Sequence, residues 1–529
     1  MELDQVTLTL LLTSDVHGHV LPINYATNEV VPLGMAYAAT HIKRLRKENP
    51  NLLLIDNGDS IQGTPLTYHY AKFRNHLPNP MISIMNHLEY DCTTIGNHEF
   101  NYGLSMAKKA VKESLFPWLS SNILDKTSQE PYFGFPFIVK KMNDVKVVIL
   151  GVTTHYIPNW ENPLHIEELD FEDAFLSTKR WVEFIRDTEK PDLLVVSYHG
   201  GFECDLENGK PTEHLTGENQ GYQMCQEIEG IDLLLTGHQH RQIATTINGT
   251  YVLQSGFHAQ NIGKATITLM RDSHNNWCIK TIIGEVTSLA NEEPDEEVLK
   301  LVCKNELETQ LWLDEAIGKI EGSMLIVDSF DVRLNEHPMI EWINRVQMDA
   351  AGVKISNTSL FDNSSRGLPS FVTMRDIVSN YIYPNTLSVL ELTKEEIKEA
   401  LELSASYFRI NEDNNIVVNP TFITPKPQHY NYDMWEGIDY TIDVAQPIGQ
   451  RIIKLSFHQQ DQNGPFLVVM NNYRAGGGGN FELFKNKTVV KEILTDMAEL
   501  LADYLQVHQV VKACVNNNFT VINSNKDSL

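Results

Sequence analysis

Cysteine and long apolar runs are both scarce in this chain of 529 residues. Its six cysteines lie far apart and form no Cys-x-x-Cys pair, so a small fold held together by disulfides is excluded, and we expect all six to be reduced and buried. No stretch approaches the roughly 18 consecutive apolar residues of a membrane helix. Two of the first four residues, Glu2 and Asp4, are acidic, whereas the start of a signal peptide is basic. As given, the chain is expected to be cytoplasmic, or exported if an export signal was removed ahead of Met1.

Positive charge is the other deficit of the sequence. The chain has 42 basic and 69 acidic side chains, which gives a formal net charge of −27. Such a surface repels polyanions, which argues against a nucleic acid polymer or an anionic membrane as a partner. An anionic small substrate therefore needs a local source of positive charge. The length allows about two to four domains, each large enough to bury its own core.

Apolar runs typical of buried strands alternate with helical patterns from residue 6 to about residue 240, which predicts an α/β domain. An acidic stretch at 290–315 charges the start of one long helix, and we place the domain boundary there. The remainder mixes helices and strands and is predicted to be an α+β domain. The expected parts are a first domain at 1–290, a linker helix at 291–315 and a second domain at 316–529, whose end at 516–529 is expected to be frayed.

Potential metal ligands follow five of the predicted strands. In α/β sheets, ligands bind in the crevice outside the carboxyl ends of the strands, so these five sets of side chains can converge on one place. Glycines beside them allow tight turns and a close approach of the backbone to a ligand. The five sets are Asp15-Val16-His17-Gly18-His19, Asp56-Asn57-Gly58-Asp59, Gly96-Asn97-His98-Glu99, His199-Gly200-Gly201 and Gly237-His238-Gln239-His240.

The composition of these sets predicts which ions they hold. Asp, His and Asn ligands without Cys favour a divalent ion such as Mn²⁺, Zn²⁺, Co²⁺ or Fe²⁺ over a structural zinc. Seven ligands of this type are too many for one ion. Two ions about 3.5 to 4 Å apart that share a carboxylate would use them all, which is the arrangement for in-line attack on phosphorus.

The order of these motifs resembles that of the metallophosphoesterase superfamily, and the whole chain resembles its bacterial 5′-nucleotidase and 2′,3′-cyclic-nucleotide 2′-phosphodiesterase branch. The resemblance implies an α/β fold: an N-terminal calcineurin-like metallophosphoesterase α/β sandwich domain and a C-terminal α+β nucleotidase domain that binds the nucleotide. His98 would face the scissile phosphate as a proton donor or transition-state stabiliser, while His19 receives no role. The implied metal ligands are Asp15, His17 and His240 for one ion, Asn97, His199 and His238 for the other, and Asp59 as the bridge.

The second domain contains the segment Asn471–Phe481, in which a Tyr-Arg pair precedes four glycines. It lacks the Gly-Lys-Ser/Thr of a Walker loop and is either a flexible surface loop or, as we favour, backbone that closely approaches a planar, charged ligand. In the resembled family, one aromatic at the position of Tyr473 stacks on the base and an aromatic of an earlier segment covers its other face. Stacking of this kind tolerates any base. The candidate substrate-binding residues are Tyr430, Tyr432, Tyr473, Arg474 and Arg375, where Arg375, like Arg366, is either a phosphate-steering residue or part of a surface salt bridge.

One departure from the family pattern narrows the expected substrate. 5′-Nucleotidases commonly read Gly-Asn-His-Glu-Phe-Asp, whereas this chain has Asn101 at the last position, next to the candidate catalytic His98. Asn followed by Tyr-Gly-Leu resembles the 2′,3′-cyclic-nucleotide 2′-phosphodiesterase/3′-nucleotidase subgroup. We therefore expect a two-metal phosphohydrolase that opens 2′,3′-cyclic nucleotides and then removes the 3′-phosphate, with His98 and Asn101 as catalytic residues.

Three alternatives remain open at this level. A 5′-nucleotidase or nucleotide-sugar pyrophosphatase would use the same metals. A non-catalytic nucleotide-binding protein would keep the fold, but the intact ligand set argues against it, because such polar groups are costly to bring together without an ion. A nuclease of the same superfamily is disfavoured by the charge of −27 and by a stacking loop suited to a single base. No oligomeric state is inferred.

Overall fold

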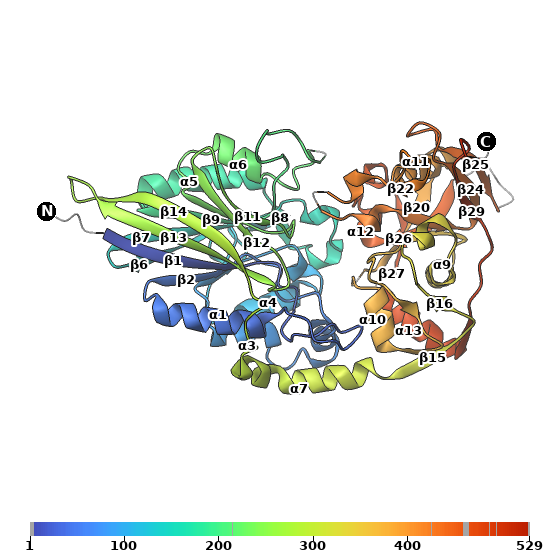
Figure 1. Cartoon of the computed structure of the whole chain (residues 1–529), viewed down its shortest axis with the longest axis horizontal. Helices are drawn as coiled ribbons and strands as arrows, with labels where there is room; N and C mark the ends of the chain where they lie inside the picture. The colour runs from blue at the N-terminus through green and yellow to red at the C-terminus, as the bar shows by residue number, and fades with distance from the viewer. Residues whose placement is uncertain are drawn as a thin grey trace. The chain divides into compact units, whose positions relative to one another are not determined.

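The computed structural model describes residues 5–213, 215–383, 385–424, 426–458, 465–485, 487–493 and 495–526. The chain divides into two compact units, Met1–Thr309 and Gln310–Leu529 (Figure 1). The division falls within helix α7 (Glu296–Leu313). The expected domain limits at residues 290 and 315 stay predictions.

Unit 1 is built on two six-stranded sheets. A pair of short strands, β5 (Ile123–Asp125) and β8 (Leu169–Phe171), lies outside them. The first sheet has the order β14 (Trp277–Ser288), β13 (Asn261–Arg271), β1 (Gln5–Thr13), β2 (Leu52–Asp56), β3 (Cys92–Thr94), β4 (Trp118–Leu119). The second has the order β11 (Gln242–Ile247), β12 (Thr250–Ser255), β10 (Leu233–Thr236), β9 (Leu193–His199), β7 (Val145–Thr153), β6 (Phe137–Met142).

The central strands of both sheets run parallel, which brings their carboxyl ends to the same edge. In the first sheet, Asp56 at the end of β2 pairs with Thr13 of β1 and with Thr93 of β3. In the second sheet, Tyr198 of β9 pairs with Thr236 at the end of β10. Strands buried on both faces read as continuous apolar runs, as in the Leu-rich β1. The loops that carry the candidate ligands follow these paired ends.

One hydrophobic core lies between the two sheets, and another lies between the second sheet and its helices. Leu10 of β1 belongs to the same buried cluster as Ile149 of β7, while the next residue of β7, Leu150, shares a cluster with Ile185 of α5. Alternate residues of β7 thus face the two cores. Figure 1 shows α5 and α6 above the strands and α1 and α3 below them. The helices are α1 (Met35–Glu48), α2 (Pro65–His69), α3 (Pro80–His87), α4 (Leu104–Glu113), α5 (Ala174–Thr188) and α6 (Gly221–Glu227), with short 3₁₀ turns at His98–Phe100, Ile157–Asn159 and Pro163–His165.

Unit 2 has its own core around a mixed five-stranded sheet. The sheet has the order β23 (Asp433–Glu436), β17 (Ile355–Ser359), β26 (Phe466–Asn471), β20 (Leu387–Leu392), β27 (Val489–Ile493). Smaller sheets are formed by β19 (Phe371–Thr373), β15 (Ala316–Glu321) and β28 (Val510–Lys512), by β25 (Ile452–Phe457), β24 (Ile438–Asp443) and β29 (Phe519–Ile522), and by the pairs β16 (Met324–Leu325) with β18 (Gly367–Leu368) and β21 (Phe408–Ile410) with β22 (Ile416–Val418).

Local sequence explains where the helices of unit 2 begin and end. Helix α9 (Pro338–Ala351) starts with a proline, whose missing N–H is not needed in the first turn, and ends at Gly352 in the left-handed conformation. Helix α11 (Lys394–Ala405) starts with a capping box between Thr393 and Glu396. The other helices are α8 (Asp331–Leu334), α10 (Met374–Asn380), α12 (Asn472–Ala475) and α13 (Met497–His508).

The structure corrects two expectations. The C-terminal segment is not frayed as far as it is described, because β29 pairs in parallel with β24 and Phe519 is buried. All six cysteines are free, but only three are buried: Cys278 and Cys303 are exposed and Cys514 is half-buried. Cys278 lies on β14, where alternate side chains face solvent, so its burial could not be read from residue type alone.

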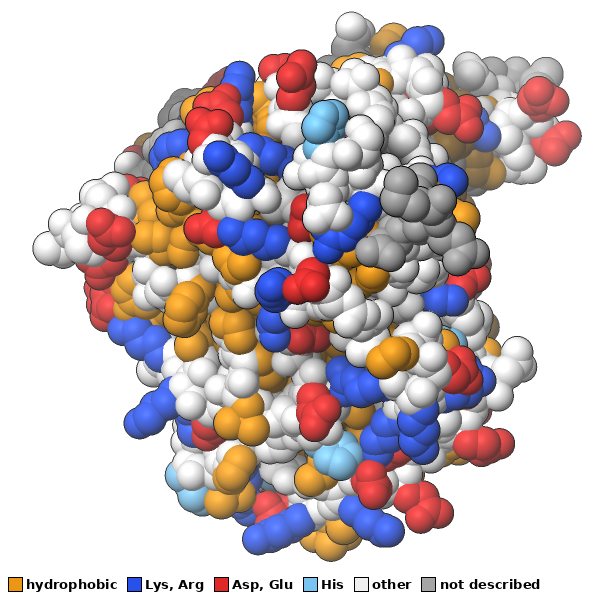
Figure 2. Space-filling view, turned by 90° about the vertical axis from the view of Figure 1, so that its left-hand side faces the viewer, with side chains coloured by type: hydrophobic (Ala, Val, Ile, Leu, Met, Phe, Trp, Pro, Cys, Tyr) orange, Lys and Arg blue, Asp and Glu red, His pale blue; other side chains and the backbone are white. Residues whose placement is uncertain are grey.

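The surface shows mixed charge in spite of the acidic composition. Figure 2 shows acidic and basic side chains interspersed over one face, with hydrophobic side chains between them. Within the described ranges, no helix is both long and apolar enough to cross a membrane.

Candidate metal centre

Backbone hydrogen bonds join the loops after β1 and β2, and the loop after β3 packs closely against the second of them. The backbone N–H of Asp15 donates to the carbonyl of Gly58 at 3.0 Å, and that of His17 donates to the carbonyl of Asp59 at 2.8 Å. Gly58 has φ 100°, and a Cβ there would lie 2.6 Å from the backbone nitrogen of Gly96. Only glycine therefore allows these loops to lie so close together.

Many candidate ligands have an unusual backbone conformation. Positive φ is uncommon outside glycine and costs on the order of 1 to 3 kcal/mol per residue where the surrounding structure enforces it. Such residues cluster at functional sites, because the strain is retained only where a side chain must be aimed. Those with φ between 49° and 63° are Asp15, His17, Asp59, His238 and His240.

The first cluster consists of Asp15, His17 and His240. The Nε2 atoms of the two imidazoles lie 3.1 Å apart, and Oδ1 of Asp15 lies 4.0 Å from that of His17 and 3.5 Å from that of His240. One ligand atom of each residue lies within 4.8 Å of the others. Asp15 is fully buried, and both of its carboxylate oxygens accept the backbone N–H of His238. The loops after β1 and β10 thus aim two nitrogens and one oxygen at a common point.

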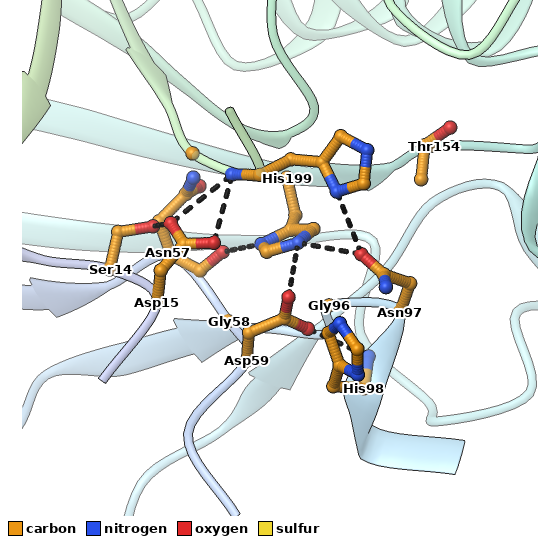
Figure 3. Close-up of polar contacts among 12 residues, drawn as sticks. Ser14, Asp15, Asn57, Gly58, Asp59, Gly96, Asn97, His98, Thr154 and His199 are labelled. Carbon is orange, nitrogen blue, oxygen red and sulfur yellow. Dashed lines mark hydrogen bonds and ion pairs between the residues drawn. The ribbon is translucent and has the colours of Figure 1, made fainter. Parts of the chain in front are cut away.

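The second cluster joins Asp59, Asn97 and His199 from three further strand ends (Figure 3) with His238, which follows β10. Nε2 of His199 lies 3.1 Å from Oδ2 of Asp59 and 3.1 Å from Oδ1 of Asn97. Nδ1 of His238 lies 3.0 Å from the same Asn97 oxygen, and Asp59, His199 and His238 have ligand atoms within 4.8 Å of one another. His199 is held in orientation because its Nδ1 donates to the carbonyl of Asn57 at 2.7 Å.

Asp59 also belongs to a third grouping, with His17 and His98, whose ligand atoms lie within 4.8 Å of one another. One carboxylate oxygen of Asp59 faces His199, while the other accepts the backbone N–H of His98 at 2.7 Å. Asp59 is therefore the carboxylate that lies next to ligands of both clusters.

In the metal-free chain, contacts among the clustered side chains determine which of them are ionised. Burial acts to raise the pKa of Asp59, but the charges of His199 and His98 outweigh it and hold that pKa well below its usual range. Burial acts to lower the pKa of His199, but the charge and hydrogen bond of Asp59 raise it to about 10. Burial and the charges of His98 and His240 hold the pKa of His17 well below its usual range. Without metal, His199 and Asp59 thus form a buried ion pair, and His17 is neutral.

The donor set fits divalent metal. Imidazole nitrogens, carboxylates and an amide oxygen suit Mn²⁺, Zn²⁺ and related ions. The Nε2 atoms of His17 and His240 face each other at hydrogen-bond distance, and a shared cation satisfies both lone pairs where a hydrogen bond would use only one. The residues present therefore match a metal centre of this class.

His98 is held by a chain of three side chains. Its Nδ1 lies 2.6 Å from Oδ1 of Asn101, and Nδ2 of Asn101 donates to Oε2 of Glu161 at 2.7 Å. The other oxygen of the buried Glu161 faces Nδ1 of His165 at 2.9 Å. Because Glu161 accepts from the amide nitrogen, the amide oxygen of Asn101 must face His98, which places a proton on Nδ1 and leaves Nε2 for chemistry.

Sequence reasoning missed several residues around the centre. Glu161 lies in an irregular loop that matches no motif. Glu218 lies in a different irregular loop, and its Oε1 is 2.8 Å from Nε2 of His238. Trp160 stacks on His238 with ring centroids 5.3 Å apart. Glu99, which is part of a recognised motif, accepts the backbone N–H groups of Asp59, Ser60 and Gly96, and burial and the charge of Asp59 raise its pKa to about 7. Only the last of these could have been suspected from its neighbours in sequence.

His19, which received no role, lies beside the centre. It stacks on His258 with ring centroids 3.7 Å apart, and His258 makes an edge contact with His17 at 5.9 Å. Burial lowers the pKa of His19 to about 4. The two imidazoles therefore act as neutral packing groups behind His17.

The candidate substrate residues have very different environments. Tyr432 is fully buried in the core of unit 2. Arg474 is 2% exposed and is engaged by the chain itself, because its guanidinium pairs with Asp433 at 2.8 Å and donates to the carbonyl of Tyr430 at 3.0 Å. Arg375 is bonded to Asp314 and Gln310. Tyr430 and Tyr473 are both half-buried, and Arg474 links their two segments.

Comparison with known proteins agrees with this geometry. Residues 8–242 match the model of the calcineurin-like phosphoesterase family, and residues 316–486 match that of the 5′-nucleotidase C-terminal domain. The structure is similar to the crystal structure of a Staphylococcus aureus protein in complex with α-ketoglutarate, with a TM-score of 0.88 and 35% identity, covering 98% of this chain and 100% of that one.

Curated relatives are similar over nearly the whole chain. The trifunctional nucleotide phosphoesterase YfkN of Bacillus subtilis is 26% identical over 98% of this chain, which spans only 39% of that protein. The 2′,3′-cyclic-nucleotide 2′-phosphodiesterase/3′-nucleotidase of Haemophilus influenzae is 25% identical over 97% of this chain and 86% of its own length. Protein UshA of Escherichia coli is 31% identical over 94% of this chain and 90% of its own length. The chain therefore belongs to the calcineurin-like metallophosphoesterases that carry a 5′-nucleotidase C-terminal domain.

Proposed function

We propose that this chain is a two-metal phosphohydrolase that opens 2′,3′-cyclic nucleotides to 3′-nucleotides and then removes the 3′-phosphate. The observation that carries this is the pair of ligand clusters joined by Asp59. Asp15, His17 and His240 would hold one ion, Asn97, His199 and His238 the other, and Asp59 both. When bound, two such ions lower the pKa of the attacking water and neutralise charge on the phosphoryl oxygens. Mn²⁺ and Zn²⁺ are the ions we propose.

The role of His98 follows from its hydrogen bonds. With Nδ1 held by Asn101, its Nε2 is the atom that can carry a proton to the leaving oxygen. In the proposed first step, water oxygen bonds to phosphorus, the bond from phosphorus to the 2′-oxygen breaks, and that oxygen takes up the proton. In the second step, the bond to the 3′-oxygen breaks in the same way and releases phosphate.

Unit 2 is proposed to bind the base. Tyr473 stands at the start of α12, where its ring lies against Gly478: a Cβ on that glycine would lie 2.6 Å from the ring. Arg474 fixes the distance between this segment and that of Tyr430. We propose that Tyr430 and Tyr473 stack on the two faces of the base, and that Arg474 holds their two segments together. The full burial of Tyr432 supports a core role for that side chain.

The preference for cyclic over 5′-substrates rests on Asn101 and on the relatives named as 2′,3′-cyclic-nucleotide phosphodiesterases. The test is release of phosphate from 2′,3′-cyclic AMP, 3′-AMP and 5′-AMP by protein reconstituted with Mn²⁺ or Zn²⁺, with a phosphatase added to reveal ring opening. We expect a higher kcat/KM for the cyclic substrate than for 5′-AMP. A preference for 5′-AMP would favour the 5′-nucleotidase alternative, and no activity on any of them would contradict the proposed function.

A further inference from the structure

Both ring nitrogens of His238 face oxygen atoms of other side chains. Nδ1 lies 3.0 Å from Oδ1 of Asn97, and Nε2 lies 2.8 Å from Oε1 of Glu218, which belongs to neither ligand cluster. Amide and carboxylate oxygens accept hydrogen bonds and do not donate them, so a neutral imidazole, with its single N–H, satisfies only one of the two. The doubly protonated ring would satisfy both, but it has no lone pair for a metal. A metal-binding His238 must therefore place its proton at one of these two oxygens.

The surroundings of the two nitrogens decide which of them is the metal ligand. The Asn97 oxygen that faces Nδ1 of His238 also lies 3.1 Å from Nε2 of His199, and that nitrogen lies 3.1 Å from a carboxylate oxygen of Asp59. The candidate ligands of the second cluster therefore converge on the Nδ1 side of His238, and the carboxylate of Glu218 lies alone on the Nε2 side. Nδ1 is the nitrogen that keeps its lone pair, and Nε2 carries the proton that Glu218 accepts.

The backbone of Glu218 is held by the strands that carry the second cluster. Its carbonyl oxygen accepts hydrogen bonds from the hydroxyl of Thr154 at 2.7 Å and from that of Tyr198 at 3.3 Å. Both of these side chains are fully buried. Thr154 directly follows β7, and Tyr198 precedes His199 at the end of β9. The position of Glu218 is thus fixed relative to His199, although the two lie in different segments of the chain.

We propose that Glu218 is a positioning residue for the second metal ion. It accepts the Nε2–H of His238 and so keeps Nδ1 unprotonated and directed at the ion that Asn97 and His199 also bind. Trp160 restricts the same ring from its face, because the two rings stack with an interplanar angle of 25°. This inference rests on the proposed two-metal centre, and it gives Glu218 no contact with the substrate.

Titration calorimetry of the metal-free full chain with Mn²⁺ tests this role without any measurement of activity. The unchanged protein is expected to bind two ions. In Glu218→Ala one of them should bind about 10- to 100-fold more weakly, the loss typical of removing the hydrogen-bond partner of a ligating histidine, while the other ion is much less affected. Glu218→Gln keeps an oxygen that accepts from Nε2 and should retain most of the affinity. Glu207→Ala, which changes an exposed glutamate of the same loop, is the control.

Nuclear magnetic resonance of the Zn²⁺-loaded protein reads the proton itself. The Nε2–H of His238 should give a ¹H–¹⁵N signal that is protected from exchange in the unchanged protein and in Glu218→Gln, and lost in Glu218→Ala. The side chain of Glu218 is one-third exposed, so its truncation opens no core and the variant is expected to fold.

The outcomes separate this inference from the proposed function. If the unchanged protein binds two ions but Glu218→Ala binds both as tightly, or loses affinity for both equally, the role of Glu218 is wrong and the metal centre stands. A loss in Glu218→Gln as large as that in Glu218→Ala would also contradict positioning by a hydrogen bond. If the unchanged protein itself binds fewer than two ions, the two-metal centre and the proposed function fail together with this inference.

Discussion

Asp59 is the residue on which both metal clusters depend, because its two oxygens face different ligands. Asp59→Ala leaves two cations with no anion between them, so both are expected to lose occupancy together. We expect activity to fall by more than the roughly 100-fold typical of changes outside the ligand set. Elemental analysis after gel filtration should give fewer than one ion per chain, against two in the unchanged protein. The exposed Asp144→Ala is the control, and retention of one full ion in Asp59→Ala would show that the two sites are independent.

Glu161 is a positioning residue, because it touches Asn101 and not the reacting atoms. In Glu161→Ala the amide of Asn101 is free to turn, so we expect kcat to fall about 10-fold or more with little change in KM. Glu161→Gln keeps an oxygen that can accept from Asn101 and is expected to restore most of the rate. Glu168→Ala, an exposed glutamate of the same loop, is the control.

The tautomer of His98 shows whether Glu161 positions this imidazole or only stabilises the fold. Imidazole ¹⁵N shifts should show the Nδ1–H form of His98 in the unchanged protein and a mixture of tautomers in Glu161→Ala. An unaltered tautomer together with a lower rate would contradict the positioning role. The same contacts predict that Asn101→Asp does not simply create an Asp–His catalytic pair. The new carboxylate would lie next to that of Glu161, which accepts a hydrogen bond from Asn101 at 2.7 Å in the unchanged protein.

His199 makes metal binding depend on pH. Its pKa is raised to about 10 by Asp59, so in the metal-free chain it is protonated at pH 7.5, whereas a metal ligand must be the neutral imidazole. Binding of Mn²⁺ is therefore expected to release about one proton from this residue, and affinity should weaken as pH falls. Calorimetry in buffers of different ionisation enthalpy measures that release. His199→Asn should release about one proton fewer, His165→Asn should match the unchanged protein, and equal release from all three would disprove the assignment.

At the scale of elements, the loop between β7 and β8 positions two parts of the centre at once. Trp160 stacks on His238 while the adjacent Glu161 holds Asn101. The sequence could not predict this, because the loop has no periodicity and no motif. By contrast, the ligand loops after β1, β2 and β3 were predictable, since parallel pairing of apolar strands brings their carboxyl ends together and the ligands follow those ends directly.

Helix α12 and its glycine-rich continuation carry the proposed base site. Tyr473→Ala removes a stacking surface worth about 1 to 3 kcal/mol, so KM for 2′,3′-cyclic AMP is expected to rise roughly 5- to 100-fold. Tyr473→Phe keeps the ring and should be nearly unchanged. Hydrolysis of bis(p-nitrophenyl) phosphate, which has no base, is the measurement that controls for damage to the metal centre. An equal loss on both substrates would contradict base stacking by this residue.

Over the whole molecule, prediction from sequence was strongest where a single local pattern decides the structure. The limits of α9 can be read from the sequence, because Pro338 and Gly352 mark its two ends, and β20 follows a largely apolar run, Leu387–Leu392. Prediction from sequence was weakest where strands that pair lie far apart in the chain. The segment 516–529 is polar overall, but the short strand β29 within it is stabilised by β24, whose pairing no local pattern reveals. The roles of Arg474 and Tyr432 likewise depend on burial that residue type does not report.

The two units have separate hydrophobic cores, so we expect two unfolding transitions that respond to different changes. Mn²⁺ at about 100 times its Kd should stabilise unit 1 by about 2.7 kcal/mol, because it binds the folded state alone. Differential scanning calorimetry should show one transition that moves upward with Mn²⁺ and no longer does so in Asp59→Ala. Leu401→Ala opens a cavity in the core of unit 2 and should lower the free energy of unfolding of that unit by about 2 to 5 kcal/mol. The other transition should then occur at a lower temperature, while the Mn²⁺-dependent transition stays where it was. One transition displaced by both changes would instead show that the two cores unfold as a single cooperative body.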